Sequence, residues 1–104
     1  MEKNKFINNK REGYWEINYS SSQLHSKGNY INNQKIGYWE LYNGNGTLAY
    51  KGNYKNGERE GYWEVYHFDG NIWSKGNYIN ARKVGYWEFY FFSGELYNKE
   101  YFVV

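Results

Sequence analysis

The tetrapeptide Gly-Tyr-Trp-Glu occurs four times in this chain, and its spacing constrains the fold more than any other feature. The copies begin at Gly13, Gly37, Gly61 and Gly85, so each starts 24 residues after the one before it. A constant period in this range is typical of a chain that stacks one supersecondary unit on the next. The sequence therefore predicts a single repeat domain over residues 1–104, with a half unit at 1–12 and units at 13–36, 37–60, 61–84 and 85–104.

Two kinds of turn signal divide each unit into a pair of short strands. Asn45-Gly46 and Asp69-Gly70 separate short runs rich in aromatic residues, a strong sequence signal for a two-residue hairpin turn with positive φ at both residues. Asn32-Asn33, Asn56-Gly57 and Asn80-Ala81 predict further turns between units. The predicted strands cover about 13–20, 23–31, 37–43, 47–55, 61–68, 71–79, 85–92 and 95–102, with a short one near 3–7.

Nothing in the sequence favours a helix. Glycine recurs throughout the chain, and no apolar stripe with a period of 3.6 residues is present. The expected fold class is therefore all-β, an elongated single-layer antiparallel meander of tandem 24-residue hairpins.

Charged residues support one particular strand register. If Asp69-Gly70 is a two-residue turn, Glu64 faces Lys75 across the hairpin. The same rule pairs Glu16 with Lys27, Glu40 with Lys51, and Glu88 with Lys99. Opposite charges on facing strands contribute roughly 0.2–1 kcal/mol per pair, so four such pairs favour this register.

Alternation along the strands separates an apolar Trp face from a wetter Tyr face. The Trp face is predicted to carry the repeated tryptophans and, from the returning strands, Leu24, Leu48, Ile72 and Leu96. Glycines at 28, 52 and 76 lie opposite a tryptophan, and the missing Cβ leaves room for an indole. We expect a structural role for Trp15, Trp39, Trp63, Trp87, Gly28, Gly52 and Gly76.

Composition excludes several classes of function. The chain has no cysteine, so a disulfide framework and a thiolate metal site are ruled out. Its only aspartate, Asp69, is explained by a turn, and its two histidines, His25 and His67, lie in different units. We therefore expect no enzyme, no catalytic residue, no metal and no cofactor. Without an apolar run for a signal peptide or a membrane span, the expected location is intracellular and cytoplasmic.

The repeat resembles the MORN repeats, in particular their bacterial-type variant. The pattern Tyr-x-Asn-Gly-x-x-x-Gly-x-Trp is met by Tyr54-Lys55-Asn56-Gly57 through Gly61-Tyr62-Trp63, and it continues through Asp69-Gly70 and Ile72 to Gly76. The resemblance implies an elongated sheet of hairpins that serves as a scaffold or adaptor for proteins. Lipid head groups are proposed ligands for some members, and bacterial members often carry the label antitoxin-like.

Partner binding is expected where the repeat is broken. Trp73 occupies a column that holds His25, Ala49 and Tyr97 in the other units, so the repeat does not require tryptophan there. We predict that Trp73 projects from the Tyr face as a binding hot spot, with drift in a tolerant column as the alternative. The further partner-binding candidates are Tyr42, Tyr62, Tyr66, Tyr86, Tyr90, Lys75 and Phe102.

Several kinds of partner remain open at this stage. A protein partner on the aromatic face or on the C-terminal edge strand is the leading hypothesis, and that edge also suits a homodimer. Binding of a carbohydrate, a choline-like group or a lipid head group on the aromatic ladder is the alternative. Nucleic acid is not expected, because the net charge is only +2 and each lysine of the Tyr face has a glutamate beside it.

Overall fold

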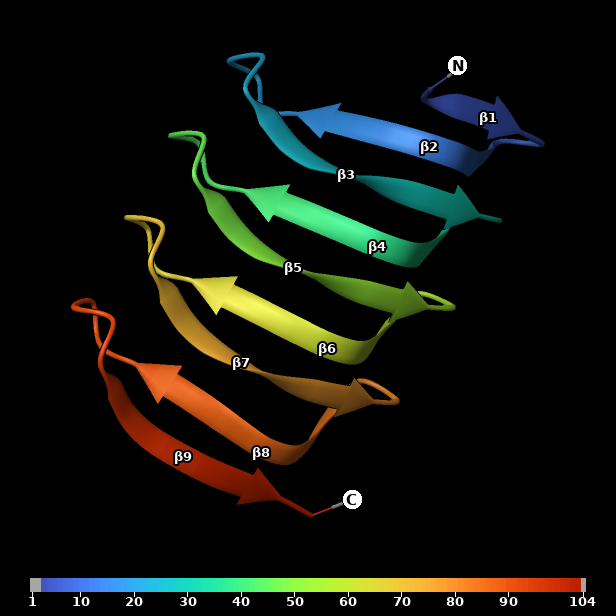
Figure 1. Ribbon diagram of the computed structural model, residues 1–104. Coiled ribbons are helices and arrows are strands. Elements are labelled where there is room, and N and C mark those ends of the chain that lie inside the picture. Colours follow the sequence, from blue (N-terminus) through green and yellow to red (C-terminus); the bar gives the residue numbers. More distant parts are fainter. Residues whose placement is uncertain (1–2, 104) are drawn as a thin grey trace.

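The protein is a single open sheet in which every strand pairs with its neighbours in chain order (Figure 1). The computed structural model describes residues 3–103. The strands are β1 Lys5–Ile7, β2 Lys10–Asn18, β3 Leu24–Ile31, β4 Gln34–Tyr42, β5 Leu48–Lys55, β6 Glu58–Tyr66, β7 Ile72–Ile79, β8 Arg82–Tyr90 and β9 Leu96–Phe102. The described residues contain no helix. With principal extents of 46 × 34 × 19 Å, the sheet is one layer, and the all-β antiparallel meander is confirmed.

Every strand that carries Gly-Tyr-Trp-Glu begins three residues earlier than predicted. β6, for example, starts at Glu58 rather than at Gly61. Gly61 has φ of 78°, and the register between β5 and β6 passes from Gly52↔Trp63 to Asn53↔Glu60, so Gly61 has no partner on β5. Glycine accepts a positive φ without steric cost, and the strand continues through the irregularity. Glycine in the tetrapeptide is thus a bulge residue and not a strand boundary.

The two kinds of turn have geometries different from those predicted. The turns between units are the two-residue kind with positive φ at both residues, as at Asn56 (50°) and Gly57 (83°). Within a unit, the Gly70 N–H donates to the His67 carbonyl at 2.9 Å, and Gly70 has φ of 97° while Asp69 is not in the left-handed region. This is the longer loop in which a glycine bulge follows the turn. The prediction of two positive φ values at Asp69-Gly70 was wrong.

That longer loop changes the face on which the next residues lie. The predicted register holds as far as Val65↔Ser74, but the next pair is Tyr66↔Ile72, which leaves Trp73 without a partner. A slip of one residue moves side chains to the opposite face. Ile72 therefore lies on the Tyr face and Trp73 lies over the Trp face, both opposite to the prediction. The same register places Leu24, Leu48 and Leu96 on the Tyr face as well.

The core of this thin sheet is a ladder of edge-to-face aromatic rings on the Trp face. Tyr54 and Tyr78 pack edge-on against Trp63, with ring centroids 5.1 and 6.1 Å from it. The Trp63 Nε1–H donates to the Asn53 carbonyl at 3.0 Å. Trp63 is 1% exposed. Trp39 and Trp87 repeat the same hydrogen bond one unit earlier and one unit later, both at 3.0 Å. A polar atom on each indole is thereby satisfied inside the ladder.

The glycine columns provide the room for this ladder. Trp63 faces Gly76 in the register of its own hairpin, as predicted. Its indole, however, leans over Gly52 of the preceding unit, where a Cβ would overlap the ring. Gly28 under Trp39 and Gly76 under Trp87 repeat this contact. The second, third and fourth full units are therefore each joined to the unit before by a tryptophan–glycine contact.

Candidate binding surfaces on the two faces of the sheet

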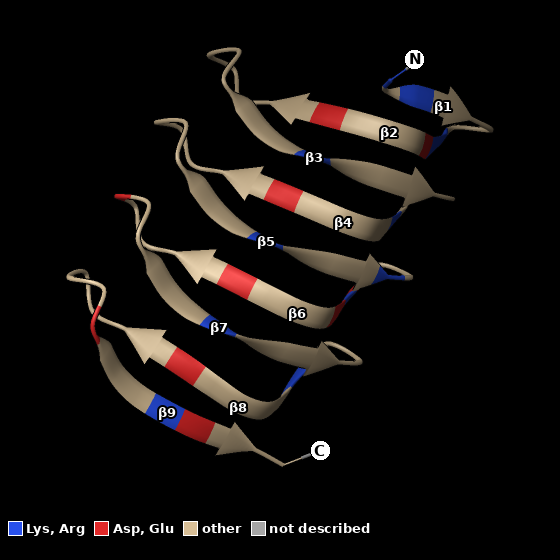
Figure 2. Ribbon diagram, in the orientation of Figure 1, with Lys and Arg blue, Asp and Glu red and all other residues tan. Residues whose placement is uncertain are grey.

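The Tyr face carries a row of alternating charges across the strands, visible as red and blue bands in Figure 2. The predicted register of Glu64 opposite Lys75 is present, but the ion pairs connect each lysine to the glutamate of the following unit. Lys51 Nζ lies 3.4 Å from Glu64, and Lys75 Nζ lies 3.6 Å from Glu88. Each of these lysines lies between the glutamate of its own hairpin and that of the next unit. Because the ion pair is formed with the glutamate of the next unit, it connects successive hairpins.

Tyrosine hydroxyls complete this row. The hydroxyls of Tyr62 and Tyr66 both donate to Glu64, that of Tyr62 at 2.8 Å. Partial burial, followed by its hydrogen bond to Glu40, raises the pKa of Tyr42 to about 12. Partial burial opposes ionisation of Glu64, but the hydrogen bonds from its two tyrosines and the charge of a lysine outweigh it and lower its pKa.

Most partner-binding candidates on the Tyr face already use their polar groups within the sheet. These are Tyr42, Tyr62, Tyr66, Tyr90 and Lys75, each of which bonds a glutamate. Tyr86 is exposed and packs edge-on against Tyr101, with ring centroids 4.9 Å apart. Phe102, on the edge strand β9, is partly buried and packs against the cluster of Trp63, Tyr78 and Trp87.

An exposed aromatic cluster lies at the loop end of the last two units. We name it the aromatic patch; it comprises His67, Phe68, Trp73, Phe91, Phe92 and Tyr97, which share a hollow of about 500 Å³. The His67 ring stacks on Trp73, with centroids 5.1 Å apart, and on Phe92, with centroids 4.3 Å apart. Its Nε2 lies 3.0 Å from the Tyr90 carbonyl oxygen. Trp73 is 48% exposed and Phe92 is 61% exposed.

Of the residues that line this hollow, sequence reasoning singled out Trp73 and Tyr90. Phe68 and Phe92 occupy a loop column that holds Ser20 and Gly44 in the first two units. The aromatic residues that appear in this column in the last two units were a sequence signal for the aromatic patch. It was missed because the loop residues were treated only as turn chemistry.

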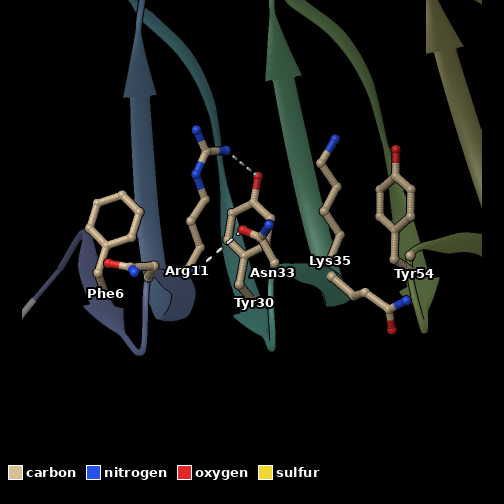
Figure 3. Close-up of a pocket in the computed structure, with 9 residues that line it drawn as sticks. Phe6, Arg11, Tyr30, Asn33, Lys35 and Tyr54 are labelled. Atoms are coloured by element: carbon tan, nitrogen blue, oxygen red, sulfur yellow. Dashed lines mark hydrogen bonds between the residues drawn. The ribbon is translucent and has the colours of Figure 1, made fainter.

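A second surface, also missed, runs along the Trp face near the turns between units. We name it the aromatic–cation row, because it alternates aromatic and basic residues in strand order: Phe6, Arg11, Tyr30, Lys35, Tyr54, Arg59, Tyr78, Lys83 and Phe102. Figure 3 shows the first five side chains rising side by side from consecutive strands. Its sequence signal is a basic residue four positions before each repeated tryptophan, with the same period of 24.

Each cation of this row lies against aromatic rings. Lys35 Nζ is 5.1 Å from the ring centroids of both Trp39 and Tyr54. Arg11 Nη1 donates to the Tyr30 hydroxyl at 3.1 Å, and its guanidinium carbon lies 4.8 Å from the Trp15 centroid. Cation–π contacts of this kind are worth about 0.5–1 kcal/mol when exposed and more when desolvated.

The row is also positively charged and hollowed. Arg11, Tyr30 and Lys35 help to line a hollow of about 660 Å³ (Figure 3). Burial, then the positive charges of Arg59 and Arg11, lower the pKa of Lys35. None of the row's four cations forms an ion pair with a carboxylate within residues 3–103.

Together, the open sheet of tandem hairpins and its constant period of 24 residues define a repeat protein. Residues 11–32, 35–56 and 59–80 match the MORN repeat variant, and the chain belongs to this family. MORN repeats are commonly scaffold or binding modules and are generally non-catalytic. They generally mediate interactions with proteins or membrane lipids. A search of curated proteins found no match.

Two further observations concern chemistry and membranes. Within residues 3–103, no three His, Cys, Asp or Glu side chains come together as a metal site requires. Over the same residues, the protein has no helix that is long and apolar enough to cross a membrane.

Proposed function

We propose that this protein is a non-enzymatic scaffold or adaptor that binds a protein partner through the aromatic patch. The observation that carries the proposal is the exposed stack of Trp73, His67 and Phe92 at one end of the sheet. Exposed aromatic side chains gathered around a hollow are typical of interface hot spots. A contiguous apolar surface is unusual on a protein that has no partner for it.

The C-terminal edge strand extends this surface. β9 pairs with β8 on one side only, and Tyr97 belongs both to β9 and to the aromatic patch. A strand added to β9, from a partner or from a second copy, would form main-chain hydrogen bonds beside the patch. We therefore expect the patch and the edge to act together in one interface.

The alternative of a choline-like ligand is less well supported. Aromatic cages bind quaternary ammonium groups through their ring faces. On the Trp face the rings of Trp39 and Trp63 already have Lys35 and Arg59 within 5.1 Å and 5.0 Å. A cationic ligand would meet like charge there. We therefore favour a protein partner.

Replacing Trp73 by alanine should weaken partner binding by about 30-fold or more, because a hot-spot side chain is worth about 2 kcal/mol or more. The fold should remain, since Ala49 holds this position in the second unit. Ile31→Ala is the matched control, because Ile31 is equally exposed but lies at a turn between units. The partner is first captured from the native cell with the wild-type chain and then titrated by calorimetry against each variant.

The proposal would be contradicted if both Trp73→Ala and Phe92→Ser, each with an unchanged circular dichroism spectrum, bound the captured partner as tightly as the wild type does. Equal losses in Ile31→Ala and Trp73→Ala would also contradict it, because binding would then not be localised to the aromatic patch.

A further inference from the structure

Within residues 3–103, the four cations of the aromatic–cation row differ from the lysines of the Tyr face in having no carboxylate as an ion-pair partner. Lys27, Lys51 and Lys75 each pair with a glutamate. Lys35 and Arg59 of the row instead contact aromatic rings, and no carboxylate within residues 3–103 pairs with them. A partly buried positive charge is costly unless it is paired. The row is therefore complementary to an anion supplied from outside.

The geometry of the sheet sets the spacing of that anion. Successive cations lie on every second strand, on β2, β4, β6 and β8. Neighbouring strands are about 4.7–4.9 Å apart, so the row repeats about every 9.6 Å. The occupant that fits best carries one negative charge at that interval along its length.

A polyproline II segment matches this interval. It has three residues per turn and a rise of about 3.1 Å, so every third side chain points the same way after about 9.3 Å. The mismatch over three intervals is only about 1 Å. An α-helix with a carboxylate every seventh residue repeats at about 10.5 Å and drifts by about 3 Å over the same length. Phosphates of a nucleic-acid strand are spaced much more closely, at about 3.4 Å along a duplex axis.

The aromatic members of the row supply the second half of the match. Tyr30 and Tyr54 stand between the cations, and the hollow at this point opens between their side chains (Figure 3). Polyproline II segments bind in grooves lined by aromatic rings. Because such a segment is already extended, it loses little conformational entropy on binding. Tyr30 and Tyr78 are themselves buried, so the apolar contacts come from Phe6, which is exposed, and from Tyr54 and Phe102, which are partly exposed. These rings and the cations offer apolar contacts and charge contacts in the same line.

We infer that the aromatic–cation row binds an acidic polypeptide segment in the polyproline II conformation, with a carboxylate at every third residue. The segment lies across the strands, and each carboxylate meets one of Arg11, Lys35, Arg59 and Lys83. The row runs near the turns between units, and the aromatic patch lies toward the opposite ends of the strands (Figure 1). In the last two units the two surfaces meet, because Arg59 and Lys83 of the row and Trp73 of the patch line one hollow of about 400 Å³. The row adds a second contact of defined chemistry to the proposed scaffold.

Two labelled peptides of identical composition test the inference on the wild-type chain. One contains four Glu-Pro-Pro triplets, and the other has its four glutamates in one block followed by the prolines. Fluorescence anisotropy should show the periodic peptide binding about tenfold more tightly than the block peptide, and more weakly as salt screens the charges. Equal affinities, or no saturable binding of the periodic peptide at millimolar protein, would overturn the inference.

Variants locate the site. Lys35→Met with Arg59→Met removes two charges but keeps apolar stems against the rings, and it should weaken binding of the periodic peptide at least about tenfold. Lys51→Met on the Tyr face, where Lys51 pairs with Glu64, is the matched control and should leave binding unchanged. Thermal unfolding of each variant verifies the fold. Loss of peptide binding in the control, or equally tight binding of oligothymidylate to the wild type, would count against an acidic polypeptide as the occupant.

Discussion

Replacing Gly52 by alanine should lower the free energy of unfolding by about 3 kcal/mol, the upper end of the usual cost of overfilling a packed site. A Cβ at this position would overlap the indole of Trp63. The ring cannot move aside easily, because it is buried, its Nε1–H is bonded to the Asn53 carbonyl, and Tyr54 and Tyr78 pack edge-on against it. One added methyl group would therefore disturb the contact that joins the second unit to the third.

Gly44 provides the control for this substitution. A Cβ at Gly44 meets no heavy atom within 4 Å, and its backbone is not in the left-handed region. Gly44→Ala should therefore be neutral or stabilising by up to about 1 kcal/mol, through the unfolded state. Urea unfolding followed by tryptophan fluorescence measures both variants. If the free energy of unfolding of Gly52→Ala were within about 0.5 kcal/mol of the wild-type value, the tryptophan–glycine contact would not be what determines the packing between units.

Replacing Trp63 by alanine should have the second large effect, a loss of about 3–5 kcal/mol, the range for truncating a buried aromatic side chain. The substitution removes the ring that bridges Tyr54 and Tyr78 and leaves the Asn53 carbonyl without its indole donor. Since small domains have only about 5–15 kcal/mol of stability in total, this variant should be close to unfolding at room temperature.

Trp73→Ala is the matched comparison for Trp63→Ala, because both remove the same side chain from the third unit. Trp73 is half exposed and is not part of the buried aromatic ladder. Its truncation should therefore lower the free energy of unfolding by less than about 1 kcal/mol. Chemical unfolding of the two variants under one set of conditions makes the comparison. Similar losses for both would mean that Trp73 supports the fold as the repeated tryptophans do.

The repeat alone was enough to predict the fold, because each Gly-Tyr-Trp-Glu copy fixes the same hairpin and the glutamate–lysine columns fix its register. What the sequence did not predict are the bulges. The sequence around a glycine such as Gly61 looks the same whether the glycine ends a strand or forms a bulge within one. Which of the two occurs depends on pairing with the neighbouring strand, and pairing with β5 extends β6 back to Glu58.

The candidate surfaces were only partly predictable for the same reason. Trp73 was recognised because it departs from its column, yet it was assigned to the wrong face, since the bulge between Val65 and Tyr66 inverts the alternation. The row of Arg11, Lys35, Arg59 and Lys83 is periodic and readable in the sequence. It was missed because basic residues were compared only with nearby glutamates, and aromatic partners such as Tyr54 for Lys35 become neighbours only across the strands.

The central claim is that four tryptophans build the sheet while the fifth, Trp73, is available to a partner. Hydrogen exchange of the five indole N–H groups, followed by nuclear magnetic resonance, tests it most directly. The Nε1–H groups of Trp15, Trp39, Trp63 and Trp87 donate to backbone carbonyls inside the ladder, so we expect four slowly exchanging signals and one fast signal, assigned to Trp73. A protected Trp73 signal, or a Trp63 signal that exchanges as fast as that of Trp73, would contradict the claim.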